Sequence, residues 1–317
     1  MRYRCLALAV VLAVGLTSSA AGQFKDASED RKGPRIGQGV SQRFQAGIVV
    51  TAESGPCSGI LGTAAIPIDW PEQEVHVAEE DVSPTAQITY QMLEGTVKVM
   101  VVRIPRLPAG QQAKALVTLE IKRSPLLPPK RTDIYRLPNP RRLPREIRPY
   151  LGPSPKIEAT NPKIKALARQ IVGTKQNAWE QVEALYDYVR EKVQQKSGPL
   201  KGALAALRDG VGNHEDLAAA FIALCRAADI PARTVWVPKY CYPEFYLVDD
   251  EGVGHWFPCQ VAGKREFGGI SETGPILAKG DSFRAAQNPR ERQRFPAESV
   301  TGEGSPKVQS VRKLLSE

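Results

Sequence analysis

The sequence is poor in the residue types from which metal sites are usually built. Its 317 residues include only three histidines (His76, His214 and His255) and five cysteines. No two cysteines form a Cys-x-x-Cys pair, and the histidines are scattered along the chain. Structural zinc sites use closely spaced Cys and His ligands. We therefore expect no metal ion, and no cofactor is indicated.

Long apolar runs are missing as well. The run Leu6–Leu16 has 11 residues, whereas a bilayer-spanning helix needs about 20. Two arginines precede this run and the small residues Ser19 and Ala21 follow it, which is the layout of a secretory signal peptide. We predict that residues 1–21 are removed and that the protein is exported, periplasmic or secreted, without a transmembrane segment after cleavage. A retained anchor is the alternative.

Acidic residues are fewer than basic ones, 34 against 43. Much of the excess lies between Lys122 and Arg148, where nine basic residues face two acidic ones in a proline-rich stretch. We interpret residues 123–158 as a solvated, semi-rigid connection between two domains. The alternative is a patch that binds a polyanion of the cell envelope. Nucleic acid is not expected, because no nucleic-acid-binding motif is recognisable.

The pattern before this connection has a period of two residues. Apolar residues alternate with polar ones over 88–92, 97–101 and 115–121, and shorter candidates lie at 48–51, 66–68 and 75–77. Several short strands at this spacing predict an antiparallel β-sandwich over residues 44–122. No chemistry is evident in this part of the chain.

The pattern after the connection becomes helical. Asn161-Pro162 is a helix start signal, and Leu217–Ala228 is apolar except for Arg226, which predicts a buried central helix. Three strands are expected over 234–237, 242–247 and 254–259. We assign residues 159–263 to this second domain. Residues 264–317 are interpreted as a polar C-terminal extension, with loop over 289–294 and a short helix over 307–315.

The second domain resembles the transglutaminase-like superfamily over roughly a third of the chain. The resemblance rests on the buried helix, on the following Arg226–Arg233 (RAADIPAR), and on strands that carry Glu244 and Trp256. It implies an α+β fold class, with an N-terminal antiparallel β-sandwich followed by a transglutaminase-like (papain-like) α+β domain. It also implies a mechanism in which a cysteine at the amino end of the buried helix attacks a carbonyl, a histidine accepts its proton and an aspartate orients the histidine.

The three residues of that mechanism are all substituted. His214 stands where the family has its nucleophilic cysteine. Counting four residues back from Glu244 places Tyr240 at the histidine position. Counting four beyond Trp256 places Gln260 at the aspartate position. An imidazole cannot form the thioester, and a tyrosine with a pKa of about 10 is a poor base at neutral pH.

Cys241 is the alternative nucleophile, and its orientation depends on strand register. The short turn expected at residues 249–252, between the last two strands, suggests that Leu247 pairs with Val253 or Gly254. In that register Cys241 lies opposite Cys259 and points away from the triad-equivalent positions. Directly opposed strand residues lie at about disulfide distance, so we predict a Cys241–Cys259 bridge. A register shifted by one residue would instead turn Cys241 toward the site.

The sequence therefore leaves three hypotheses. The first is a catalytically degenerate transglutaminase-like protein that acts as a binding or structural module of the cell envelope, with a protein or peptide ligand in the former active-site cleft. The second is an active cysteine transamidase or peptidase that uses Cys241. The third is an envelope scaffold that binds polyanions through the basic connection.

Overall fold

The computed structural model describes residues 32–173, 175–285 and 290–315. The signal-peptide prediction for residues 1–21 lies outside these ranges, and export stays a prediction. Within the described ranges, no helix has the length and apolar character required to cross a bilayer.

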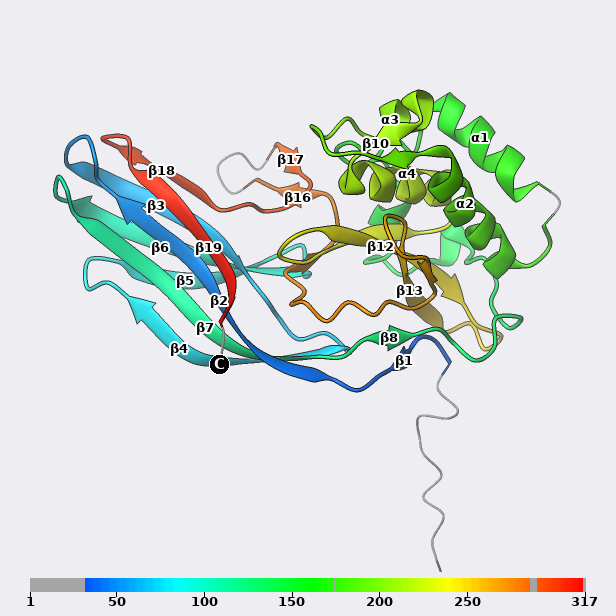
Figure 1. The fold of residues 1–317 in the computed structure, drawn as a ribbon, viewed down its shortest axis with the longest axis horizontal. Coiled ribbons are helices and arrows are strands. Elements are labelled where there is room, and N and C mark those ends of the chain that lie inside the picture. The colour runs from blue at the N-terminus through cyan, green and yellow to red at the C-terminus, as the bar shows by residue number, and fades with distance from the viewer. Residues whose placement is uncertain (1–31, 174, 286–289, 316–317) are drawn as a thin grey trace, which may run out of the picture. The chain divides into compact units, whose positions relative to one another are not determined.

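A β-sandwich is built from two four-stranded antiparallel sheets (Figure 1). The first sheet has the order β18 (Ser299–Glu303), β3 (Cys57–Ile66), β6 (Val97–Leu107) and β5 (Gln87–Leu93). The second has the order β19 (Lys307–Leu315), β2 (Val40–Thr51), β7 (Gln112–Arg123) and β4 (Gln73–Val82). Alternate side chains of the inner strands are buried, among them Phe44 and Ile48 of β2. The predicted sandwich is confirmed.

The C-terminal segment differs from the prediction, because residues 307–315 form a strand and not a helix. β19 pairs with β2 along its whole length, with Leu314 opposite Phe44. The spacing of Val308, Val311 and Leu314 suits a helix when read alone, but β2 would otherwise expose an unpaired edge. The sandwich is therefore assembled from two parts of the chain that are far apart in sequence, and the last segment is a component of it.

The second domain packs four helices and a five-stranded antiparallel sheet (Figure 1). Its helices are α1 (Pro162–Val172), α2 (Ala178–Lys192), α3 (Ala203–Asp209) and α4 (His214–Ala227). The sheet has the order β14 (Glu266–Phe267), β13 (Gly254–Gln260), β12 (Cys241–Val248), β11 (Ala232–Trp236) and β15 (Ala278–Lys279). Every residue of α4 from Asp216 to Arg226 is buried, as predicted for the central helix.

Short elements complete the fold. They are β1 (Arg35–Ile36), β8 (Leu126–Leu127), η1 (Pro140–Arg142), η2 (Arg148–Leu151), β9 (Gln194–Gln195), β10 (Val211–Gly212), β16 (Phe283–Arg284) and β17 (Arg292–Gln293).

The proline-rich connection is less solvated than expected. Tyr135 stacks on Trp179 of α2 with ring centroids 5.7 Å apart, and Leu143 and Ile147 are buried. A connection that only spaced two domains apart would have no reason to bury these side chains, since each contributes about 1.5–3 kcal/mol when removed from water. The segment is therefore fixed on the second domain.

Buried charges join the sandwich to the second domain. The Lys279 Nζ atom lies 2.6 Å from a Glu72 carboxylate oxygen and 2.7 Å from one of Glu244. Arg233 completes the group with a 2.7 Å ion pair to Glu244. Burial raises the pKa of Glu244, but the charges of Lys279 and Arg233 outweigh that effect and hold the pKa at about 2.

Candidate functional site

The amino end of α4 is rigidly organised. The side chain of Asn213 accepts a hydrogen bond from the Asp216 N–H at 2.9 Å, and the Asp216 carboxylate accepts one from the Asn213 N–H at 3.0 Å. The same carboxylate accepts N–H groups of Lys201 and Gly202, both at 2.8 Å. This reciprocal capping box fixes the first turn of the helix. His214 is the first residue of that turn and is half-buried.

Tyr240 directly precedes β12 and Gln260 ends β13, and the two side chains lie close together. The Tyr240 phenol donates a hydrogen bond to the carboxylate of Glu272. Burial and then this carboxylate raise the pKa of Tyr240 above its usual value, while a hydrogen bond from the Gln260 side chain lowers it slightly. The phenol therefore keeps its proton at neutral pH and acts as a donor.

His214 is not joined to this pair. Within the described part of the chain, its side chain makes no hydrogen bond or ion pair with Tyr240 or Gln260. Tyr240 packs beside Val235 and Tyr242 in one apolar cluster, whereas α4 belongs to another. The structure thus brings two of the three expected positions into contact and leaves the third at the helix end.

Arg294 lies beside the amino end of α4, a position that the sequence did not reveal. Its Nε atom is 3.5 Å from a Glu215 carboxylate oxygen, and its guanidinium lies over the Trp236 ring at 5.6 Å from the centroid. Trp236 pairs directly with Cys241 across β11 and β12. The segment that carries Arg294 therefore contacts both the amino end of α4 and strand β11.

Cys241 and Cys259 are free thiols in the structure, which contradicts the predicted disulfide. The register behind that prediction is wrong, because Leu247 pairs with His255. Burial raises the pKa of Cys241 to about 12 and that of Cys259 well above its usual range. Cys241 is 2% exposed. Reactive cysteines need accessible thiolates, and neither side chain meets that requirement.

His255 lies on β13 and is partly buried. Its Nε2 atom lies 2.8 Å from an Asp249 carboxylate oxygen, and its side chain is 15% exposed. The other oxygen of Asp249 accepts the N–H groups of Glu251 and Val253, both at 2.9 Å. The His255–Asp249 pair therefore fixes the turn between β12 and β13.

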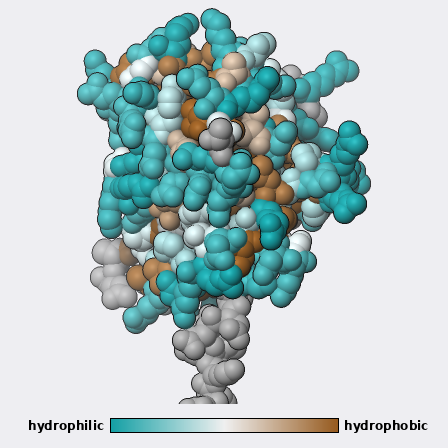
Figure 2. All heavy atoms as spheres, turned by 90° about the vertical axis from the view of Figure 1, so that its right-hand side faces the viewer, coloured by the Kyte–Doolittle hydropathy of each residue, from teal (hydrophilic) through white to brown (hydrophobic). Residues whose placement is uncertain are grey.

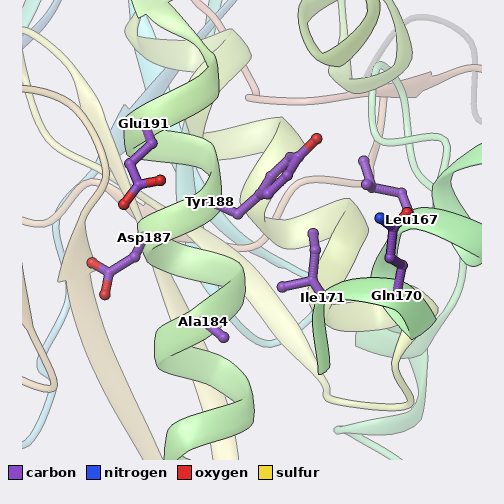
Figure 3. A pocket seen from close by; sticks show the side chains of 7 residues that line it. All are labelled: Leu167, Gln170, Ile171, Ala184, Asp187, Tyr188 and Glu191. Atoms are coloured by element: carbon purple, nitrogen blue, oxygen red, sulfur yellow. The ribbon is translucent and has the colours of Figure 1, made fainter. Parts of the chain in front are cut away.

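A cavity of about 380 Å³ opens between α1 and α2, and none of the predicted site residues lines it (Figure 3). Leu167, Ile171, Ala184 and Tyr188 supply its apolar part. The surface seen from the right-hand side of Figure 1 is mostly hydrophilic, with apolar areas between hydrophilic side chains (Figure 2). The cavity is thus separate from the positions at which the family places its chemistry.

The buried helix α4 beneath an antiparallel sheet, followed directly by the RAADIPAR segment, defines a domain of the transglutaminase-like fold. Residues 165–261 match the family described as the Transglutaminase-like superfamily, and they include His214, Tyr240 and Gln260. The transglutaminase-like fold expected from the sequence is confirmed. A search of curated proteins found no match.

Two solved structures are similar to this chain. A candidate cysteine protease from Cytophaga hutchinsonii is 19% identical, with a TM-score of 0.58 over 90% of this chain and 93% of that chain. A candidate protease from Parabacteroides distasonis is 13% identical, with a TM-score of 0.27 over 66% of this chain and 47% of that chain. The first shares the fold across both domains, and the second value is too low to show a shared fold.

Proposed function

We propose that the protein is a catalytically inactive transglutaminase-like module that acts by binding, exported to the cell envelope and with a peptide or protein ligand as partner. The observation that carries the proposal is the identity of the residues at the three catalytic positions. Acyl transfer by the papain-like mechanism needs a thiolate, a base and a group that orients the base. His214 supplies no thiol, Tyr240 holds its proton, and Gln260 has no imidazole to orient.

Cys241 does not replace the missing nucleophile. With a pKa of about 12, only about one thiol in 100,000 is ionised at pH 7. The side chain is also shielded, because it belongs to the apolar cluster that contains α4. Loss of the nucleophile typically reduces acyl transfer by several powers of ten. This supports binding over catalysis.

The remaining polar groups suit recognition. Tyr240, Gln260 and Glu272 present a phenol, an amide and a carboxylate within one partly buried cluster. Such groups bind peptide N–H and C=O groups by hydrogen bonds without reacting with them. A peptide ligand in the former cleft is therefore the partner that fits this chemistry best.

Alkylation of the folded protein with iodoacetamide at neutral pH tests the proposal. We expect no modification of Cys241 until guanidinium unfolds the chain, and no release of ammonia from glutamine peptides. A matched Cys241→Ser variant should match the wild type in labelling of the folded protein and in the absence of ammonia release, and should differ only by one alkylated thiol after unfolding. Rapid labelling of Cys241 together with amide cleavage that the variant loses would show that the protein is an enzyme.

A further inference from the structure

Five arginines form an exposed cluster on the connection between the two domains. Within residues 136–148, the sequence RLPNPRRLPREIR has no lysine and a single acidic residue, Glu146. All five arginine side chains are exposed. We call this cluster the arginine patch, and it consists of Arg136, Arg141, Arg142, Arg145 and Arg148.

The backbone that carries the patch is held in place. Arg136 exchanges two backbone hydrogen bonds with Val248 of β12, at 2.8 and 3.1 Å. Leu143 and Ile147 are 3% and 7% exposed and pack against Tyr246. Proline restricts the backbone further, and proline precedes Arg141 and Arg145 in the sequence. The arginines are therefore displayed from a preformed surface, which reduces the entropy that binding would cost.

The charges of the patch are not neutralised within the protein. Neighbouring basic residues have carboxylate partners, such as Arg131 with Asp133 at 2.6 Å and Lys32 with Asp250 at 2.6 Å. Across the described ranges, no carboxylate oxygen forms an ion pair with any arginine of the patch. Arg148 makes a hydrogen bond to the Leu143 carbonyl at 2.8 Å. Like charges gathered within one short segment, residues 136–148, repel one another, and an anionic partner would relieve that repulsion.

We propose that the arginine patch binds a linear polyanion that carries repeated phosphate or sulfate groups. Guanidinium groups hold such oxyanions by paired, charge-assisted hydrogen bonds, which lysine cannot reproduce. This partner goes beyond the peptide ligand proposed above and uses a different surface. The binding free energy comes chiefly from the release of counterions, so affinity falls steeply with salt.

Two other anionic partners fit the patch less well. Membrane-binding segments combine basic side chains with exposed aromatic or leucine side chains, and Leu137 is the one large hydrophobic residue of 136–148 that is exposed, at 36%. Single-stranded nucleic acid is bound by stacking on exposed aromatics. Of the aromatic residues that flank the patch in sequence, Tyr135 is buried, and Tyr150 packs edge-on against Trp256 at 5.4 Å between centroids. The patch therefore offers charge without an insertion or stacking surface.

The test is a titration of the full chain with fluorescently labelled long-chain inorganic polyphosphate, with unlabelled heparin as competitor, over a range of salt concentrations. The first variant carries Arg141→Gln, Arg142→Gln and Arg145→Gln. The matched control carries Lys163→Gln, Lys165→Gln and Arg169→Gln, which removes the same charge from exposed positions of α1. Thermal unfolding of both variants verifies that the fold is retained.

We expect the patch variant to bind polyphosphate at least about tenfold more weakly at about 0.15 M salt. The slope of log affinity against log salt should become shallower by about two to three. The control should lose less than about threefold, and heparin should displace polyphosphate. Several results would overturn the proposal: equal losses in both variants, no binding by the wild type, preferential binding to phosphatidylglycerol vesicles, or preferential binding to single-stranded DNA.

Discussion

The residues that carry the family resemblance fall into two regions with opposite character. In the first region, the two arginines of RAADIPAR form buried ion pairs. Arg226 contacts both carboxylate oxygens of Asp281, at 2.9 and 2.8 Å, and Arg233 pairs with Glu244. The second region consists of His214, Tyr240 and Gln260, which we assign to the triad positions by motif counting, and among the described residues His214 makes no hydrogen bond to either of the other two.

This difference separates the scaffold of the domain from its chemistry. A buried charge that loses its partner costs several kcal/mol of stability, so the first region is required for the fold whatever the domain does. We expect the second region to contribute less to folding, because His214, Tyr240 and Gln260 are only partly buried. A transglutaminase-like fold alone is therefore weak support for transglutaminase activity.

The largest expected effect comes from removing one partner of a buried ion pair in the first region. Asp281→Ala leaves the Arg226 guanidinium buried without its counter-charge, and we expect a loss of about 3–5 kcal/mol in the free energy of unfolding. Guanidinium denaturation followed by circular dichroism measures it. His214→Ala in the second region should change stability by less than about 0.5 kcal/mol. Similar losses from the two substitutions would remove the distinction between scaffold and chemistry.

The second-largest expected effect is the change in the free energy of unfolding with pH that the buried charges cause. The pKa of Glu244 is about 2 in the folded protein and about 4.3 in an unfolded chain. A lowered pKa stabilises the fold above the unfolded value, and this stability is lost as pH falls from about 4.3 toward 2. We expect about 3 kcal/mol to be lost over that range.

Unfolding free energies at pH 7, 4 and 3 measure this loss. Glu244→Gln should reduce the pH dependence in that window, whereas Glu146→Gln, at an exposed position, should leave it unchanged. The same slope in all three proteins would assign the acid sensitivity to other carboxylates.

Local patterns were sufficient to predict much of the fold. The apolar run of α4, its termination and the alternation along β5, β6 and β7 all depend on neighbouring residues, and the structure confirms them. β19 was missed because its strand conformation comes from pairing with β2, more than 200 residues earlier. Its own apolar spacing favours a helix, and the pairing overrides that preference.

The sequence was sufficient to choose the residues of the candidate site, but less so to predict how their side chains are placed. The positions of Tyr240 and Gln260 followed from motif counting, but Glu272, the partner of Tyr240, lies 32 residues away in a loop. The Cys241–Cys259 register failed because the Asp249 carboxylate holds a longer turn than expected, which closes between Val248 and Gly254.

The third-largest expected effect is the reactivity of a thiol introduced at His214, in the second region. His214→Cys places a thiol at the first position of α4, where the helix dipole lowers its pKa. We expect iodoacetamide to label it about tenfold faster at pH 7 than the thiol of His76→Cys, an exposed position on β4. Because His214 is separate from the Tyr240 cluster, the variant should still not cleave amides. Equal labelling rates would show that the helix end does not activate a thiol.

The smallest effect concerns the hydrogen bond between Tyr240 and Glu272. Tyr240→Phe removes the phenolic donor, and we expect a loss of about 1 kcal/mol, because the pair is partly exposed and part of the charge-assisted bond is replaced by water. Tyr188→Phe is the matched control, since the Tyr188 hydroxyl has no hydrogen-bond partner among the described residues. The two unfolding free energies give the contribution of the pair directly. If both substitutions are neutral, the phenol and the carboxylate do not stabilise the fold, and the cluster is available to a ligand at no cost in stability.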